Sequence, residues 1–404
     1  MPEGHSTPDS ERLQRFAETL LIHHFDALVC TLPSHVLLLS AYFPVVGTSI
    51  AIATTEPRLL LIVPEDEAEL AQDGYADDII TYKPSQVDRI QTVAEAATPP
   101  LQEAVRRLGI ERARIGFEFG PASEPSSYSA MNLFAGAIQA MIQQAAPHAQ
   151  LAPADDPLAK LAAVKTSREV ERIRLSCEVA GRAFGQGSGN FRPGMSEVHA
   201  AALVRSGFAV LSPKSHCGRA EGFAWCMSGP NSAKASGAYA QSRHRELATG
   251  DLVLTHANSN LGGYWTDITR TYVLGRPDAR QQELYQAIFA AREAALSAIR
   301  PGARACTVDM AARETLANRG LAAHFKHSTG HGVGFSAISA NALPRIHPAS
   351  QEILEQGMVF NLEPAVYFDD YGGIRHCDMV AVGENGADLL TPFQCTLEQL
   401  ILPA

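Results

Sequence analysis

The sequence predicts two domains, an α/β domain followed by a domain in which pairs of helices alternate with β-hairpins. At 404 residues the chain is longer than an average single domain. Short strand-like runs alternate with helical periodicity over roughly the first 150 residues, and the order helix, helix, hairpin then occurs twice. A proline-rich, acidic segment at 152–157 separates the two patterns. We therefore expect domains at 1–155 and 156–404.

The first domain is predicted from strands that alternate with helices. An amphipathic helix is expected within 10–26, where apolar residues recur at roughly helical spacing. Apolar and β-branched runs predict strands at 27–30, 36–39, 49–54, 59–63, 78–82 and 115–118. Further helices are expected at 65–72, 85–108 and 126–145. The dipeptide Pro99-Pro100 is expected to break the second of these three helices.

Capping signals and helix breakers set the helices of the second domain. Thr166 to Glu169 form a capping-box signature, which opens a long helix to about Gly185. The segment 193–196 starts a second helix, and two more helices are expected at 277–300 and 307–320. Each helix pair is followed by a strand pair, so the second domain is expected to contain a coarse structural repeat.

The composition is typical of a globular protein that binds neither nucleic acid nor membranes. Hydrophobic residues make up 46% and charged residues 19%, and the formal net charge of −10 argues against an anionic partner. The apolar runs are far too short to span a bilayer and the N-terminal segment lacks a signal-peptide pattern, so we expect a cytoplasmic protein. Seven scattered cysteines without a C-x-x-C pair indicate neither a disulfide framework nor a zinc ribbon.

A β-hairpin between Gly250 and Thr271 is the segment that suggests chemistry. Strand-like residues flank an Asn- and Gly-rich cluster at 258–263. If the loop closes at 260–263, His256 lies directly opposite Asp267, with Cβ atoms roughly 5 Å apart. Such a pair can hold a metal ion between its side chains. The alternative is a solvated hairpin with an incidental His and Asp.

A second hairpin, Met358 to Val382, repeats the arrangement. A turn at 369–373 places Glu363 opposite Cys377. His331 is a fifth candidate ligand, because the glycines on either side of it let the backbone approach closely. Each residue is a weak signal when taken alone. Their order and spacing together indicate a metal site.

Four motifs in this region resemble the pita-bread superfamily of Xaa-Pro aminopeptidases, prolidases, methionine aminopeptidases and creatinase. The motifs are GDLVLTHANSNLGGYWTDITRT, GHGVG, GMVFNLEPAVY and GGIRHCD. The resemblance implies an α+β pita-bread C-terminal domain after a creatinase N-terminal-like α/β domain. It also implies a homodimer in which the N-terminal domain helps close the neighbour's pocket. In the superfamily's metallopeptidases, two Asp, one His and two Glu hold two divalent metals that share a hydroxide, which attacks the peptide carbonyl.

The resemblance carries over only in part to the residues of this chain. Asp267 matches the bridging Asp, His331 the ligand His and Glu363 the first Glu. His256 stands where the first Asp belongs, and Cys377 stands where the bridging Glu belongs. A bridging carboxylate offers two oxygens, whereas each replacement offers one donor atom. We therefore expect a mononuclear site that favours zinc or iron over manganese or cobalt. The alternative is a site with no metal, as in creatinase.

Three further residues are expected in the substrate pocket. The resemblance places Ser236 where the family often has a His that contacts the substrate. Asn341 is the polar residue nearest to the position of a second pocket His. Arg375 is expected to orient Glu363 or a substrate carboxylate.

The sequence thus predicts a hydrolase of the Xaa-Pro dipeptidase and aminopeptidase type. It is expected to cleave a peptide or amide-like C–N bond in a small peptide or small amide, with a metal-activated water. Two alternatives stay open: a creatinase-like or ectoine-hydrolase-like, metal-independent hydrolase of a small metabolite, and a non-catalytic pseudoenzyme that binds a peptide or a partner.

Overall fold

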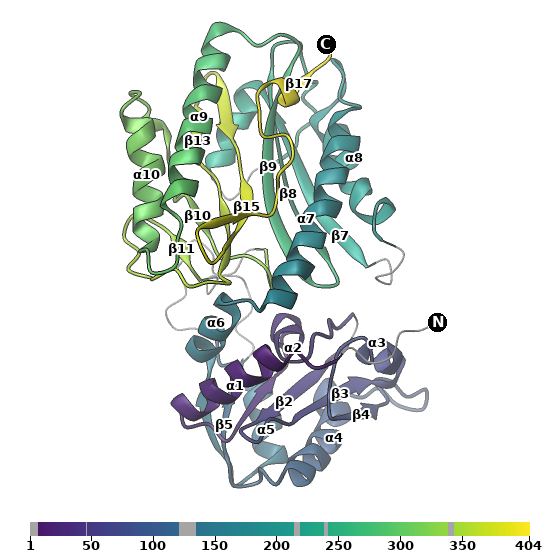
Figure 1. Ribbon diagram of the computed structural model, residues 1–404. Helices are drawn as coiled ribbons and strands as arrows, with labels where there is room; N and C mark the ends of the chain where they lie inside the picture. Colours follow the sequence, from purple (N-terminus) through teal and green to yellow (C-terminus); the bar gives the residue numbers. More distant parts are fainter. Residues whose placement is uncertain (1–6, 46, 121–134, 214–218, 238–240, 338–342) are drawn as a thin grey trace. The chain divides into compact units, whose positions relative to one another are not determined.

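The computed structural model describes residues 7–45, 47–120, 135–213, 219–237, 241–337 and 343–404 (Figure 1). The chain divides into two compact units, and the main division falls between Ala162 and Ala163. None of the helices in the described ranges combines the length and the apolar character that crossing a membrane requires.

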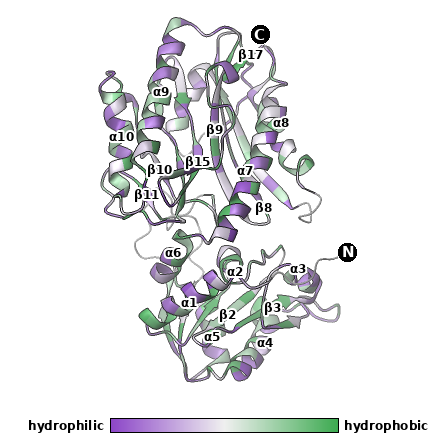
Figure 2. Ribbon diagram, viewed as in Figure 1, coloured by the Kyte–Doolittle hydropathy of each residue, from purple (hydrophilic) through white to green (hydrophobic). Residues whose placement is uncertain are grey.

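The first unit is built on a six-stranded mixed sheet in the order β4-β3-β2-β1-β5-β6. Strands β1, β2 and β3 are antiparallel neighbours, whereas β4, β5 and β6 are added in parallel. The strands are β1 Ala27–Cys30, β2 Ile50–Thr54, β3 Leu59–Pro64, β4 Asp78–Tyr82, β5 Arg114–Phe117 and β6 Gln150–Pro153. The central strands are buried along their whole length, and Figure 2 shows β2 and β3 in the hydrophobic colour. They are buried because helices cover both faces of the sheet.

The helices of this unit form the two outer layers. Helices α4 and α5 pack on one face, where Leu101 and Ile142 join strand residues such as Val29 and Ile52 in one core. Helices α1 and α2 lie on the other face (Figure 1). The helical segments are α1 Ser10–Ile22, α2 Pro33–Ser40, η1 Glu65–Glu67, α3 Ala68–Ala71, α4 Val93–Leu108, α5 Ala135–Ala145 and α6 Asp155–Ala163. The α/β prediction for the N-terminal part of the chain is confirmed.

Three predictions for the first unit are wrong. The helix predicted at 85–108 begins only at Val93, because Thr92 and Glu95 form a capping box that sets its start. Residues 36–39, predicted as a strand, belong to α2, because Pro33 fits the first turn of a helix and the Glu118 carboxylate accepts hydrogen bonds from the backbone at its start. The prolines at 99 and 100 do not break α4, which is continuous from Val93 to Leu108. Its apolar face packs into the core, and such packing overrides local propensity.

The second unit contains both predicted hairpins, each covered by helices. The first hairpin is β8 Leu252–Leu261 and β9 Tyr264–Leu274, in a four-stranded sheet of order β17-β9-β8-β7. The second is interrupted, so that β12 pairs with β15 and β13 pairs with β14 in one register. An antiparallel bridge between Thr269 and Cys377 joins the two hairpins. This bridge brings segments more than a hundred residues apart into one curved surface.

The remaining elements of the second unit surround these hairpins. The predicted capping box at Thr166 and Glu169 is confirmed, and a second one is formed by Asp278 and Gln281. The helical segments are α7 Ser167–Ser188, α8 Glu197–Val210, η3 Gly229–Ser236, α9 Ala279–Ala298, α10 Ala305–Ala317, η4 Ala322–His324 and η5 Glu398–Leu400. The other strands are β7 Ala220–Ser228, β10 Gly330–His331, β11 Arg345–Ile346, β12 Val359–Leu362, β13 Ala365–Phe368, β14 Gly372–Arg375, β15 Asp378–Val382, β16 Ala387–Leu389 and β17 Ile401–Leu402.

The predicted register of the first hairpin is wrong by two residues. Gly262 and Gly263 both have positive φ and form a two-residue turn, so Leu261 pairs with Tyr264. Consequently His256 lies opposite Thr269, and Asn258 lies opposite Asp267. A shift of two residues keeps every side chain on its face, so His256 still shares a face with Asp267. The predicted pairing of Glu363 with Cys377 agrees with the pairs on either side of it, Leu362 with Asp378 and Ala365 with Arg375.

Candidate metal centre

The five predicted ligands lie around the carboxylate of Asp267. Ligand atoms of Asp267, Glu363 and Cys377 all lie within 4.8 Å of one another. His331 Nε2 lies 3.5 Å from Asp267 Oδ2, and His256 Nδ1 lies 3.6 Å from Asp267 Oδ1. Asp267, Cys377 and His256 are buried, and the side chains of His331 and Glu363 are nearly so. The fold therefore brings four distant segments to one buried group of nitrogen, oxygen and sulfur donors.

Backbone pairing holds these segments in place. Asp267 lies in the middle of β9, and Cys377 exchanges two backbone hydrogen bonds with Thr269 on the same strand, at 3.0 and 3.3 Å. The N–H of Glu363 donates to the carbonyl of Thr329 at 2.8 Å, which ties the second hairpin to the segment before His331. The N–H of His331 in turn donates to Asn361 Oδ1 at 2.7 Å. The donors are thus fixed by strands rather than by free loops.

The protein's own groups balance the charges of this site. Burial by itself lowers the pKa of His331, but the hydrogen bond and charge of Asp267 outweigh burial and raise it to about 9. Burial favours the neutral form of Asp267, yet the neighbouring His256, His331 and Arg375 hold the pKa of its carboxyl below the usual range. His331 is therefore protonated at neutral pH and forms an ion pair with Asp267. The pKa of Cys377 is raised by burial and then by nearby carboxylates, so its thiol keeps its proton and donates to the carbonyl oxygen of Asp267 at 3.2 Å.

His256 is held by a contact on one ring face and by a hydrogen bond at its Nδ1 edge. Its ring stacks on Trp225 with an interplanar angle of 5° and a centroid distance of 5.3 Å. Its Nδ1 lies 3.0 Å from Thr269 Oγ1, an oxygen that also accepts a hydrogen bond from Arg375 Nε at 3.0 Å. Burial lowers the pKa of His256 to about 4, so its imidazole is neutral at pH 7. His256 lies at the edge of the group of donors, with its nearer nitrogen engaged by Thr269.

Arg375 lies between the carboxylate of Glu363 and the backbone of η3. Its Nη1 lies 3.7 Å from Glu363 Oε2 and 3.3 Å from the carbonyl oxygen of Ala235. Burial alone would lower the pKa of Arg375, but neighbouring Tyr367, Glu363, Cys377 and Asp267 raise it, so the guanidinium stays charged. The arrangement suits the expected role of orienting Glu363.

The two other predicted pocket residues are less closely tied to these donors. Ser236 is the last residue of η3 and half-buried, next to the residue whose carbonyl accepts from Arg375. Asn341 lies outside the described residues.

The donor set fits one divalent ion. Asp267, Glu363 and a deprotonated Cys377 would carry three negative charges, which one divalent ion and the neighbouring Arg375 guanidinium would balance, whereas the metallopeptidase pattern brings four carboxylates for two ions. A thiolate and an imidazole beside them are ligands that zinc and iron accept. Cys377 and His331 would have to lose their protons to hold a metal, because only the deprotonated forms are ligands.

Several residues of the site went unrecognised in the sequence. Thr269 and Trp225 fix His256, and Asn258 lies opposite Asp267. The signal that locates Thr269 and Asn258 is the Gly262-Gly263 pair, since a two-residue turn determines the register of β8 and β9. Trp225 comes from β7, whose register against β8 this turn does not set. Asp378 was also missed: its buried carboxylate accepts from Arg270 at 2.7 Å and from Arg292 at 2.5 Å.

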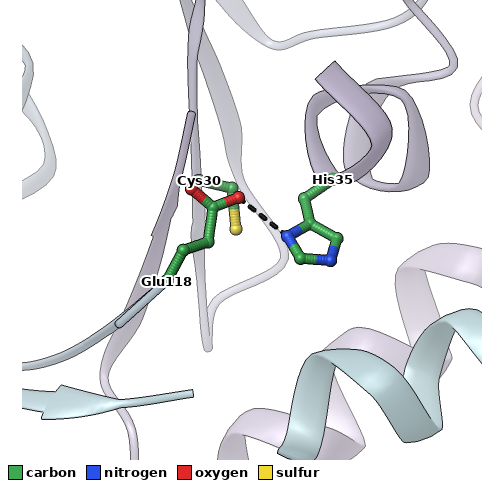
Figure 3. Close-up of side chains that lie close together, drawn as sticks. All are labelled: Cys30, His35 and Glu118. Carbon is green, nitrogen blue, oxygen red and sulfur yellow. Dashed lines mark hydrogen bonds and ion pairs between the residues drawn. The ribbon is translucent and has the colours of Figure 1, made fainter. Parts of the chain in front are cut away.

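A second group of possible ligands, Cys30, His35 and Glu118, lies in the first unit (Figure 3). Its carboxylate is already saturated. Glu118 accepts from the backbone N–H and the hydroxyl of Thr31, both at 2.8 Å, from the N–H of Leu32 at 3.0 Å, and it lies 2.8 Å from His35 Nδ1. These bonds use the four lone-pair positions of a carboxylate. The group therefore fastens the start of α2 to the end of β5.

Comparison with known proteins decides the family. Residues 171–384 match the model of metallopeptidase family M24. The chain belongs to this family. It is 29% identical over 381 residues to an Xaa-Pro dipeptidase of Pyrococcus furiosus, an alignment that covers 94% of this chain and 97% of that protein. It is 35% identical over 251 residues to a probable dipeptidase PepE of Mycobacterium tuberculosis, covering 62% of this chain and 64% of the relative.

The family M24 chain also shares its two-domain fold with solved structures. The prolidase from Pyrococcus horikoshii OT3 superposes with a TM-score of 0.75 at 25% identity, covering 96% of this chain and 100% of the other. The predicted pita-bread fold and superfamily are thereby confirmed. The prediction of a metallohydrolase of the peptidase type is confirmed at the level of the family.

Proposed function

We propose that this M24 protein cleaves short peptides of the Xaa-Pro type at a site that takes one divalent metal ion, with zinc or iron favoured. The observation that carries the proposal is the placement of ligand atoms from Asp267, Glu363 and Cys377 within 4.8 Å of one another. His331 completes this set from the side of Asp267. The relatives named as Xaa-Pro dipeptidases support the substrate class.

The residues of the chain have separate tasks in this proposal. Asp267, His331, Glu363 and Cys377 would hold the ion, and His256 closes the site beside them. When bound, a divalent ion supplies an activated water and polarises the carbonyl of the scissile bond. Arg375 would orient Glu363 through its contact at 3.7 Å. Burial of these groups excludes bulk water and strengthens their electrostatic effects.

One observation favours the metal-independent alternative. The ion pairs of His331 with Asp267 and of Arg375 with Glu363 balance the two carboxylates without a metal. A site of this kind can bind a small polar metabolite directly. The two functions therefore differ in whether a metal ion replaces the proton of His331.

Elemental analysis and turnover separate these functions. We expect zinc or iron near one ion per chain in the purified protein, and hydrolysis of Xaa-Pro dipeptides that stops when a chelator removes the metal. Dipeptides with alanine in place of proline are the matched control for substrate class. A metal-free protein that turns over a small amide supports the alternative. A metal-free protein that binds peptides without cleaving them supports the non-catalytic reading.

Further predictions concern the oligomeric state, the cellular location and the partners of the protein. A homodimer, a cytoplasmic location and the absence of nucleic-acid and membrane partners are still predictions from the sequence and the resemblance. A small peptide substrate is in keeping with the dipeptidase relatives.

A further inference from the structure

Asn258 is a buried polar residue beside the candidate metal centre. It lies on β8 directly opposite Asp267, and its side chain is completely buried. Its Nδ2 donates to the carbonyl of Thr266 at 3.3 Å. Its Oδ1, by contrast, has no hydrogen-bond partner within the described parts of the chain. A buried carbonyl oxygen without a hydrogen bond is destabilising, so this oxygen calls for a ligand.

The side chain of Asn258 lies on the same face of the hairpin as Asp267. Opposed residues of an antiparallel pair present their side chains on one face, with Cβ atoms about 4.5–5.5 Å apart. The bond from Nδ2 to Thr266 turns the other end of the amide away from that backbone carbonyl. The Asn258 side chain is also close enough to His256 to favour the protonated form of that imidazole, although burial dominates and lowers its pKa. Asp267 and His256, the two residues to which these observations tie the Asn258 side chain, both belong to the candidate metal centre.

We propose that Asn258 Oδ1 is an oxygen ligand of the divalent ion, beside Asp267. The inference rests on the proposed function, since it requires that the site bind a metal. The chain has lost a carboxylate at position 256, where His256 faces Thr269 instead. Asn258, two residues along the same face, offers an oxygen in its place but adds no charge. A neutral oxygen leaves the total charge of the ligand set unchanged.

Asn260 provides a matched control on the same strand and the same face. It is also an asparagine and 3% exposed. Its Oδ1 accepts a hydrogen bond from the N–H of Gly263 at 3.0 Å, within the turn. The atom of Asn260 that lacks a partner among the described residues is Nδ2, a donor that cannot bind a cation. Asn260→Ala therefore removes a buried amide without removing a ligand.

The test is the dissociation constant for Zn²⁺ measured by competition with a chelator, on full-length variants whose folding is checked by circular dichroism. We expect Asn258→Ala to raise the dissociation constant at least about tenfold, whereas Asn260→Ala leaves it within about twofold. Asn258→Asp, which keeps an oxygen at the same place and adds charge, is expected to bind Zn²⁺ about tenfold more tightly.

Unchanged affinity in folded Asn258→Ala overturns this inference and leaves the proposed function standing. If Asn258→Ala does not fold, Asn258→Asp decides: tighter binding supports a ligand, and unchanged or weaker binding overturns it. Wild-type protein that binds no divalent ion overturns the proposed function, and this inference falls with it.

Discussion

Two side chains that depart from the metallopeptidase pattern change both the charge and the chemistry of the site. His256 and Cys377 take the places of carboxylates, so Asp267 and Glu363 are the acidic groups left among the five predicted ligands. Each replacement removes a negative charge at neutral pH, because His256 is neutral and the Cys377 thiol is protonated before a metal binds. The consequences for metal binding can be measured one residue at a time.

Replacing Cys377 tests whether its sulfur binds the metal. We expect Cys377→Ala to weaken Zn²⁺ binding at least about tenfold, because a thiolate is among the strongest zinc ligands. Cys226→Ala is the matched control, since Cys226 is an equally buried thiol that pairs with Thr255 on the same sheet. Competition with a chelator measures both variants. Equal affinity in wild type and Cys377→Ala would assign Cys377 to the core.

Metal binding is expected to strengthen as the pH rises. At pH 7 the metal must displace a proton from His331, whose pKa is raised to about 9, and one from Cys377, whose pKa is also raised. Affinity should rise by up to about tenfold per pH unit for each proton released. Titration calorimetry at pH 7 in two buffers of different ionisation enthalpy should count about two protons.

Two histidine variants serve as the control for this count. His331→Gln should release one proton fewer, whereas His256→Gln should not alter the count, because His256 is already neutral. The metal-free protein has the opposite pH dependence: the raised pKa of His331 stabilises the folded state below about pH 6.5, and this contribution is lost as the pH rises through about 9. Affinity that is constant between pH 6 and 8 would contradict the assignment.

Among the structural elements of the first unit, the strands were predicted more accurately than the short helix that follows β1. Apolar runs located β1 to β5 because a strand buried on both faces has a continuous apolar sequence. The same logic misassigned residues 36–39, since an apolar run inside a short buried helix looks the same. What makes α2 a helix is Glu118, a residue far along the chain whose contact with Thr31 and Leu32 is not encoded locally.

The candidate site illustrates the same limit. The five predicted ligands converge because hairpin pairing and the matching of motifs constrain them strongly. Asn258 was missed because its pairing with Asp267 depends on the register of β8 and β9, which a change of one residue in the turn can shift. The network around Asp378 was missed because its partners, Arg270 and Arg292, come from elements that only tertiary packing brings together.

Glu118 should stabilise the first unit through α2. Glu118→Gln places an amide donor where the Thr31 and Leu32 donors need acceptors, so we expect a loss of about 1–3 kcal/mol in the free energy of unfolding. Urea denaturation measures the loss. Glu103→Gln is the control, because Glu103 and Arg107 form an exposed ion pair, and such pairs contribute little to stability. Neither variant should change Zn²⁺ affinity, and a changed affinity in Glu118→Gln would show that the Cys30 group affects the metal centre.

Asp378 should be the most costly carboxylate to neutralise in the second unit. It is fully buried between Arg270 and Arg292, and Arg270 also donates to the carbonyl oxygen of Cys377 at 2.7 Å. Asp378→Asn leaves two buried guanidinium groups without their partner, at an expected cost of about 3–5 kcal/mol. Asp388→Asn is the control, because its pair with Arg174 is partly exposed and worth about 1 kcal/mol or less. Thermal unfolding that shifts equally in both variants would contradict this ranking.

Considered as a whole, the molecule places its chemistry in one of its two units. The candidate metal centre is built entirely from residues of the second unit, and the first unit has a hydrophobic core of its own. The net charge of −10 disfavours anionic partners. In the predicted homodimer, the first unit of one subunit would help close the pocket of the other subunit.

The oligomeric state tests that prediction directly. We expect light scattering coupled to gel filtration to give a mass of about twice 43.3 kDa. The mass should stay constant on dilution through the micromolar range if the dimer is the working form. Activity at a constant monomeric mass would contradict a role for the partner in the site.

The bridge between Thr269 and Cys377 also has a consequence for the kinetics of folding. It joins hairpins separated by more than a hundred residues, and pairings of such long range form late because their loops are costly to close. The metal centre can exist only after that closure, so a bound ion adds its stabilisation on the native side of the rate-limiting barrier. A bound ion should therefore slow unfolding while leaving the refolding rate nearly unchanged. The lifetime of the folded chain would then depend on the metal supply, while the speed at which it folds would not.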